Sequence, residues 1–251
     1  MIAAVIVQAR MASTRLPGKV LLPLGDGTVL DQVLMRCQAI REVDRVVCAT
    51  PDTRDCDTIA TTAGAHGVDV FRGSTEDVLA RHLGAAKAVD ADVILRVTSD
   101  CPMIDPDVCT DVLSLVRNGG ADFACNNMPP LWPHGLDCEA VTIDWLARAE
   151  SEATDSYARE HVMPWIRNHA DVRKVNLVGP GGNATDQRWT IDEQSDYEFL
   201  RAIWPLLPAG PEGWAYRTPL DIVNTHPGLT SINAGKGRLT EWIKSIVGDG
   251  L

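Results

Sequence analysis

The chain lacks the long apolar stretches and the excess of positive charge that mark two large classes of protein. None of its 251 residues belongs to an apolar run of transmembrane length, and no basic segment leads into an apolar one as in a secretion signal. Lysine and arginine total 23 against 34 aspartate and glutamate, for a formal net charge of -11. We therefore expect no membrane partner and no nucleic-acid partner, since nucleic acid selects a basic face.

Paired cysteine motifs are also missing. The seven cysteines are odd in number and show no C-x-x-C spacing, so we expect reduced thiols in a cytoplasmic protein. Cys101 and Cys138 together with His134 could suggest zinc, but without metal-ligand spacing we interpret the thiols as small buried side chains. A composition that is 45% hydrophobic and 23% charged is ordinary for a globular protein with a sizeable core.

Negative charge is absent from the first 25 residues. A strand-like apolar run at 3–7 ends in a polar loop, residues 8–19 (QARMASTRLPGK), which carries three cations and a Pro-Gly turn. Open α/β sheets place ligands outside the carboxyl ends of their strands. Arg10, Arg15 and Lys19 can give charge-assisted hydrogen bonds to phosphate oxygens. The loop predicts a phosphate site, although solvated cations on an ordinary exposed loop are an equal alternative on these residues alone.

Two familiar phosphate-binding motifs do not fit the chain. A Walker A loop needs a glycine five positions before Gly-Lys-Ser/Thr, but Ser13 stands there and Val20 follows Lys19. The glycines at 25–27 lack the third glycine of a dinucleotide-binding fingerprint, and the glycine-rich stretch 179–184 is followed by no helix pattern. The predicted site is therefore of another kind.

Strand and helix patterns alternate along most of the chain. Strands are predicted at 3–7, 45–49, 92–97 and 172–178, and helices at 30–40, 55–65, 76–89 and 106–117. This alternation predicts an α/β fold with βαβ units and a mostly parallel central sheet. The stretch of about 126–188 differs, with a strand-like segment at 137–142 and two helical segments, and we interpret it as an inserted α+β subregion. We treat residues 1–251 as one domain with a C-terminal extension at 208–251 that includes a helix at 238–247.

Two acidic residues each follow a predicted strand. Asp100 comes soon after the strand at 92–97, and residues 188–192 predict another strand that ends in Asp192. Mg²⁺ is typically held by one or two such carboxylates together with substrate phosphates. We interpret Asp105 instead as the cap of the following helix, a position for which Asp100 lies too early.

Three further side chains are weaker candidates. Asp137 and Glu139 share one face of a predicted strand because side chains alternate with a period of two. Such a pair can bind a metal ion or a hydroxyl-rich ligand, and an exposed strand face is the alternative. His161 lies in a helix interrupted by proline, where a packed or salt-bridged histidine is favoured over a general base.

The loop at 8–19 closely resembles the opening loop of the cytidylyltransferases that make CMP-activated acid sugars, including CMP-Kdo and CMP-sialic acid synthetases. Later blocks look like the spore-coat-polysaccharide (SpsF-like) branch of that family and follow in order, at 72–79, 96–102, 135–139, 159–164 and 188–192. The resemblance runs from residue 1 to about 205, with a weaker echo at 231–233. Two positions depart from the branch, Met163-Pro164-Trp165 in place of Thr-Pro-Tyr and Glu193-Gln194 in place of Thr-Pro or Thr-Glu.

The resemblance implies a three-layer nucleotide-diphospho-sugar transferase-like fold and an enzyme that transfers CMP from CTP to an acidic acceptor, releasing pyrophosphate. It also implies Mg²⁺ as cofactor, CTP as co-substrate and a homodimer. The subregion at 126–188 is predicted from its pattern alone to serve acceptor binding or dimer contact. The acceptor stays open between a sugar acid, a smaller hydroxy acid and a phosphonate. CTP rather than UTP rests on the resemblance alone.

The resemblance also assigns expected roles to single residues. The contacts to CTP are Gln8, Ala9, Arg10, Ser13, Thr14, Arg15, Lys19, Ser74 and Asp77. The catalytic residues are Arg10, Arg15, Lys19 and Asp100, with Asp100 and Asp192 as metal ligands. The acceptor-side residues are Asp137, Glu139 and Arg188.

Two other classes of function stay open at this point. A glycosyltransferase that uses a nucleotide sugar on a similar fold usually carries an Asp-x-Asp metal motif after a strand, whereas the one at 90–92 precedes a predicted strand. A non-catalytic nucleotide-binding protein on the same fold is the other alternative. Three loop cations and two strand-end aspartates together count against it.

Overall fold

The computed structural model describes residues 1–234. Their centre is a seven-stranded sheet. Its strands, in the order β5-β4-β1-β6-β8-β7-β9, are β5 (Asp69–Gly73), β4 (Arg45–Pro51), β1 (Ala3–Gln8), β6 (Val93–Thr98), β8 (Glu139–Thr142), β7 (Phe123–Cys125) and β9 (Lys174–Asn176). Strand β8 runs antiparallel to its two neighbours, and the other pairs in this sheet are parallel. The predicted α/β fold with a mostly parallel sheet is confirmed.

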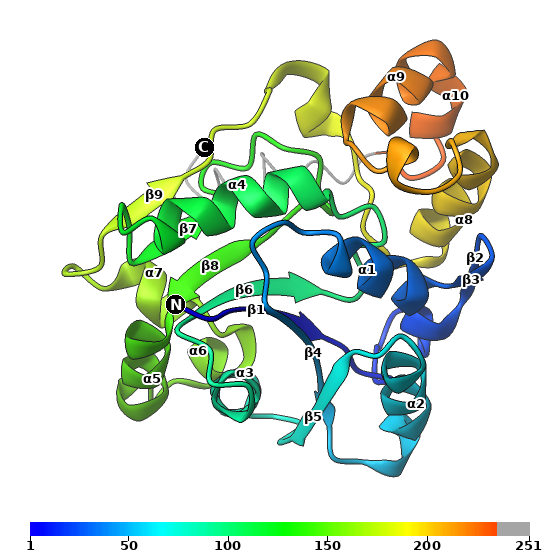
Figure 1. The fold of residues 1–251 in the computed structure, drawn as a ribbon. Helices are drawn as coiled ribbons and strands as arrows, with labels where there is room; N and C mark the ends of the chain where they lie inside the picture. The colour runs from blue at the N-terminus through cyan, green and yellow to red at the C-terminus, as the bar shows by residue number, and fades with distance from the viewer. Residues whose placement is uncertain (235–251) are drawn as a thin grey trace.

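Helices cover both faces of the sheet (Figure 1). One face packs against α1 (Val29–Gln38), α2 (Asp57–Ala65) and α4 (Pro106–Arg117). The other packs against α3 (Val78–Ala88), α5 (Ile143–Glu152), α6 (Ser156–His161) and α7 (Pro164–Asn168). Short 3-10 turns are η1 (Lys19–Leu21), η2 (Arg54–Cys56), η3 (Gly182–Asp186), η4 (Trp204–Leu206) and η5 (Pro211–Gly213).

The central strands are apolar on both faces because each contributes to two cores. Val5 and Val7 of β1 belong to the core beneath α1 and α4, whereas Ile6 between them belongs to the core beneath α3. Unbroken aliphatic runs of this kind are typical of parallel strands covered on both sides. The carboxyl ends of β1 and β6 therefore lie side by side at one edge of a rigid sheet, where their loops begin.

Helix caps agree in part with the sequence predictions. Asp105 is the N-cap of α4 as predicted, since its carboxylate accepts hydrogen bonds from the amides of Asp107 and Val108. The start of α3 differs, because the helix predicted from residue 76 begins at Val78 and is capped by the carboxylate of Asp77. The hydroxyl of Ser74 instead accepts from the amide of Asp77 and holds the turn before the helix.

The stretch 126–188 contributes to the main sheet as well as to one of its faces. Strand β8 lies between β6 and β7, β9 forms an edge, and α5, α6 and α7 lie on the same face as α3. The strand predicted at 188–192 does not form. The amide of Trp189 donates to the carbonyl of His134, whereas the amide of Ile191 donates to the carbonyl of Asp100. The hydrogen bonds of this segment therefore go to two different loops, and a strand would direct them to one neighbouring strand.

A third apolar core joins the C-terminal part of the described chain to the N-terminal third. Around Trp189 and Phe199 it gathers α8 (Gln194–Ile203), α9 (Arg217–Thr225), α10 (Pro227–Thr230) and the hairpin of β2 (Pro23–Leu24) and β3 (Gly27–Thr28). Figure 1 shows α8, α9 and α10 grouped beyond the end of α1. The helix predicted at 238–247 lies outside the described residues. Within residues 1–234 no helix combines the length and apolar character needed to cross a membrane.

Candidate active site

The cationic loop after β1 closes on itself and opens a cleft. The amide of Gly18 donates to the carbonyl of Met11 at 3.1 Å, and Gly18 has a φ of 70°, in the left-handed region that favours glycine. This turn delivers the chain into η1. As a result Arg10, Arg15 and Lys19 line one cleft of about 640 Å³ at the carboxyl ends of β1 and β6.

Most residues predicted to contact CTP lie at this cleft. Among its lining residues are Gln8, Arg10, Ser13, Thr14, Arg15, Lys19, Asp100 and Asp192. Ala9 is buried, and its amide donates to the carbonyl of Ala49. Ser74 and Asp77 are not brought to the cleft, because they build the start of α3, where the Asp77 carboxylate pairs with Arg159.

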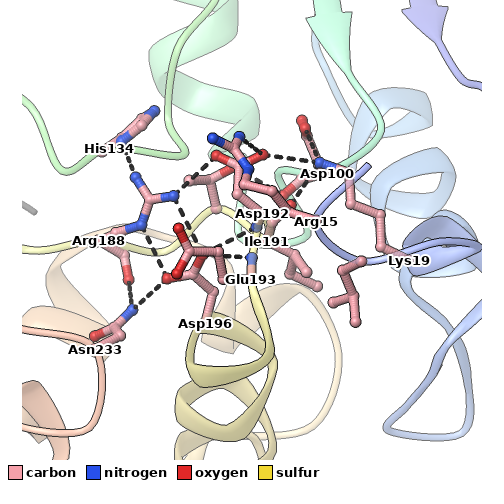
Figure 2. A network of polar contacts seen from close by, with 12 residues as sticks. Arg15, Lys19, Asp100, His134, Arg188, Ile191, Asp192, Glu193, Asp196 and Asn233 are labelled. Atoms are coloured by element: carbon pink, nitrogen blue, oxygen red, sulfur yellow. Dashed lines mark hydrogen bonds and ion pairs between the residues drawn. The ribbon is translucent and has the colours of Figure 1, made fainter. Parts of the chain in front are cut away.

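Lys19 links the two aspartates that were predicted to hold a metal ion (Figure 2). Its Nζ donates to Asp100 Oδ2 at 2.7 Å, to Asp192 Oδ1 at 3.0 Å and to the carbonyl of Ile191 at 2.6 Å. An ammonium has three donors, so this set uses all of them. Burial acts to lower the pKa of Lys19, but attraction to the two carboxylates outweighs it and raises the pKa above its usual value. The ammonium is therefore charged at neutral pH.

Backbone contacts bring Asp100 and Asp192 together from distant parts of the chain. The amide of Ile191 and the hydroxyl of Thr190 both donate to the carbonyl of Asp100, at 2.8 and 3.2 Å. Gly135 lets the same segment approach closely, because a Cβ at this position would lie only 2.7 Å from the backbone nitrogen of Thr190. The segment before α8 is thus held against the end of β6.

Asp192 lies among three cations. Its carboxylate pairs with Arg15 at 3.1 Å, with Lys19 at 3.0 Å and with Arg188 at 2.8 Å. Burial acts to raise the pKa of Asp192, but the Lys19 ammonium and the arginines hold it well below its usual range. Asp192 therefore keeps its negative charge throughout the neutral range.

The chemistry of Asp100 and Asp192 fits a magnesium ion. Their oxygens already converge on one cation, and their side chains are 24% and 21% exposed at the cleft. Mg²⁺ prefers oxygen ligands and usually takes one or two carboxylates, completing its shell with water and substrate phosphates. Zinc chemistry fits less well, because all seven cysteines are buried and unpaired and burial raises the pKa of the Cys101 thiol well above its usual value.

A second, smaller pocket of about 220 Å³ opens beside the cleft and shares Thr98 with it. Its lining residues are Arg96, Thr98, Asn127, Asp137, Glu139, Tyr157, His161, Pro164 and Arg167. Glu139 is only 2% exposed and lies between the guanidinium groups of Arg96, at 2.7 Å, and Arg167. Burial acts to raise the pKa of Glu139, but the two arginines lower it below its usual value.

Arg188 lies between the cleft and the second pocket rather than in either. Its Nη1 is 2.9 Å from His134 Nδ1, and because arginine cannot accept, the histidine nitrogen is the acceptor. The other ring nitrogen of His134 lies 3.9 Å from a carboxylate oxygen of Asp137. His134 thus lies between Arg188 and Asp137, another residue predicted for the acceptor.

Sequence reasoning missed several residues of these sites. Arg96 stands within the motif block at 96–102 but was given no role, and Arg167 belongs to no block. His161, for which a packed or salt-bridged side chain was expected, is exposed and lines the second pocket, and its ring packs against that of Tyr157 with the ring centroids 4.4 Å apart. Asp196 was missed altogether, although its spacing of four from Asp192 was available as a signal.

The chain resembles proteins of one family over most of its length. The model of the family described as cytidylyltransferase matches residues 4–209. Spore coat polysaccharide biosynthesis protein SpsF of Bacillus subtilis is 35% identical over 229 residues, which cover 88% of this chain and 94% of that protein. The structure of a cytidylyltransferase from Leptospira borgpetersenii is 31% identical, with a TM-score of 0.85 over 94% of this chain and 99% of that one.

A more distant structure supports the fold alone. CMP:2-keto-3-deoxy-manno-octonic acid synthetase, solved in complex with CTP, has a TM-score of 0.63 at 19% identity, covering 82% of this chain and 99% of that one. The fold, the cationic loop and the aspartates facing it agree with the family match. This chain belongs to the cytidylyltransferase family.

Proposed function

We propose that this enzyme transfers CMP from CTP to a small acidic acceptor, releases pyrophosphate and requires Mg²⁺. The observation that carries the proposal is the meeting of Lys19, Asp100 and Asp192 in a cleft that Arg10 and Arg15 also line. A triphosphate needs cations along its length, and its metal ion needs carboxylates. The cleft offers both, and Lys19 contacts the two carboxylates directly.

The reaction is an in-line displacement at the α-phosphorus of CTP. An acceptor oxygen forms a bond to that phosphorus and gives up its proton to water, while the bond between the α-phosphorus and the oxygen that bridges it to the β-phosphorus breaks and pyrophosphate leaves. No covalent enzyme intermediate is needed. Transfers of this type are catalysed mainly by positioning and by neutralising charge on phosphoryl oxygens.

The cations of the loop serve the triphosphate. Arg10 and Arg15 have side chains that are 42% and 59% exposed, so their guanidinium groups reach the open part of the cleft. They bind phosphate oxygens, and Lys19 offsets the charge of the leaving pyrophosphate from the inner wall. Asp100 and Asp192 would hold Mg²⁺, which when bound acts as a Lewis acid and a template at the α-phosphate.

The second pocket is proposed for the acceptor. It adjoins the cleft through Thr98, and it contains Asp137 and Glu139, two of the three residues predicted on the acceptor side. Two arginines face one buried glutamate there, and a guanidinium offers the fork of N–H donors that suits a carboxylate. The carboxylate of Asp137 can accept hydrogen bonds from hydroxyl groups of the same ligand.

Other expectations stay predictions. Ser74 and Asp77 are predicted to border the cytidine, and the homodimer rests on the family resemblance. The cytoplasmic location is predicted from the odd number of cysteines, and the role of residues 126–188 in acceptor or dimer contact from their sequence pattern. Arg188 is predicted at the acceptor side, and its contacts with Asp192 and Asp196 suggest a different role, developed below.

The test is a screen for pyrophosphate release. The full-length protein is incubated with CTP, Mg²⁺ and, in turn, sugar acids, small hydroxy acids and phosphonates. We expect release that depends on one acceptor class, fails with UTP and disappears in Asp100→Asn. Consumption of a nucleotide sugar with no release from CTP would contradict the proposal and favour a glycosyltransferase.

A further inference from the structure

A buried carboxylate lies behind the metal-facing side of the cleft. Asp196, in the first turn of α8, is fully buried and is not among the residues that line the cleft. Arg188 donates to both of its oxygens, Nε to Oδ1 at 2.9 Å and Nη2 to Oδ2 at 3.1 Å. The backbone amides of Asp192 and Glu193 also donate to Oδ2, each at 3.0 Å. Figure 2 shows these contacts converging on one side chain.

Helix capping accounts for only part of this arrangement. Asp196 closes a capping box with Glu193, and that role explains the contact with the Glu193 amide. It explains neither the amide of Asp192 nor the two-pronged contact with Arg188. Those additional bonds act on Asp192 from two directions, through its main chain and through the guanidinium that lies 2.8 Å from its Oδ2.

The C-terminal extension adds one more contact to the same group. Asn233 is 5% exposed, and its Nδ2 donates to the carbonyl of Arg188 at 2.9 Å and to Asp196 Oδ1 at 3.3 Å. It belongs to the segment 231–233, the part of the extension that weakly echoes the family. The extension thus reaches the back of the site through one amide side chain.

We propose that Asp196 and Asn233 are positioning residues that fix the orientation of the Asp192 carboxylate toward the metal ion. The inference rests on the proposed function, because that function makes Asp192 a metal ligand. Asp196 holds the Arg188 fork and the Asp192 amide, and Asn233 holds Asp196 and the Arg188 backbone. Without them the Asp192 side chain is drawn toward Arg15 and Lys19, its two other ion-pair partners.

The expected effect is on metal-dependent binding more than on folding. Mutation of a group that orients a metal ligand typically lowers metal affinity or activity by about 10- to 100-fold. Asp196→Asn removes the charge that holds the Arg188 fork, and we expect an effect in that range. Asn233→Ala removes both hydrogen bonds that Nδ2 donates, of which only the longer reaches Asp196. We therefore expect about a fivefold effect, in keeping with about 1 kcal/mol for one hydrogen bond.

The experiment measures CTP affinity by calorimetry as a function of Mg²⁺ concentration in the full-length protein. It compares the unchanged chain with Asn233→Ala, Asp196→Asn and the control Thr230→Ala. Thr230 lies in the same extension and donates to Gln187 at 3.4 Å, outside the group around Asp192. A thermal melt of each variant reports folding separately, and Asn233→Ala keeps the test decisive where Asp196→Asn fails to fold.

Each outcome decides the matter. A higher Mg²⁺ requirement in Asn233→Ala, with the Thr230→Ala profile unchanged, supports the inference. An unchanged Mg²⁺ requirement in Asn233→Ala, or an equal shift in Asn233→Ala and Thr230→Ala, overturns the inference while leaving the proposed function intact. Absence of any Mg²⁺ effect on CTP binding in the unchanged chain overturns the proposed function and this inference with it.

Discussion

The cleft and the second pocket are both built on ion clusters, with the signs reversed. In the cleft the Lys19 ammonium lies between two carboxylates, whereas in the second pocket the Glu139 carboxylate lies between two guanidinium groups. The first arrangement presents oxygens around a cation, and the second presents N–H donors around an anion. The carboxylates of the first cluster suit a positively charged ligand, as Lys19 is. The guanidinium groups of the second suit a negatively charged ligand, as Glu139 is.

The two clusters also differ in how deeply they are buried. Asp100 and Asp192 keep about a fifth of their side-chain surface at the cleft, but the Glu139 side chain is 3% exposed. Exposed carboxylates can exchange a protein cation for a metal ion, while a buried carboxylate is fixed and serves to orient its arginines. Under the proposed function, the cleft therefore exchanges its ligands, whereas the pocket holds one acceptor against fixed arginines.

The largest effect is expected from Asp100→Asn, which removes one of the two carboxylates around Lys19. The metal ion loses a charged ligand, and turnover falls by at least about 100-fold because metal ions contribute several kcal/mol to such transition states. Pyrophosphate release measures the loss, and an unchanged thermal midpoint shows that the fold survives. Near-normal turnover would remove Asp100 from the site.

Glu139→Gln tests the other cluster and is expected to act on stability. It leaves two arginines facing each other without their buried counter-charge, a change that costs about 3 kcal/mol of unfolding free energy. Urea denaturation measures the loss. The matched control is Asp137→Asn in the same pocket, with an expected cost below about 1 kcal/mol. Equal costs in the two variants would contradict the assigned roles.

Lys19→Ala removes the cation from the centre of the first cluster. We expect CTP affinity to fall about 10-fold, because the positive charge that offsets the phosphate charge from the inner wall is lost, and the chemical step to slow as well. Calorimetry and single-turnover kinetics measure the two effects. Lys19→Arg keeps the charge and is expected to retain more affinity; if alanine behaves like the unchanged chain, the loop binds another ligand.

The smallest predicted effect is a pH dependence of the Glu139 cluster. The folded pKa of Glu139 is lowered below its reference of 4.5, so its ion pairs stabilise the fold above that pH. The contribution is lost as pH falls through the folded pKa. The stability difference between the unchanged chain and Glu139→Gln is therefore expected to narrow below about pH 4.5. A difference that stays constant down to the acid transition would argue against an ionised Glu139.

Local patterns in the sequence predicted the features that depend on neighbouring residues. The strand and cationic loop at the N-terminus, the cap at Asp105 and the position of Asp100 after β6 follow from apolar runs, turn residues and capping chemistry. These features were predicted because each is decided by a few consecutive side chains.

Features that depend on contacts between distant segments could not be predicted in this way. The strand expected at 188–192 failed because its amides bind two different loops. The burial of Glu139 between Arg96 and Arg167 could not be predicted either, because Arg167 comes from α7, far along the chain. Asp196 gave a weak signal, the spacing of four shared with Arg188 and Asp192, yet only the turn before α8 makes those three side chains meet.

The most direct test of the account is calorimetric titration of the purified protein with CTP, UTP, ATP and GTP, each with and without Mg²⁺. It needs no knowledge of the acceptor and probes the cleft alone. The account predicts a clear preference for CTP that strengthens when Mg²⁺ is present. Equal binding of the four nucleotides, or binding of none, would contradict it.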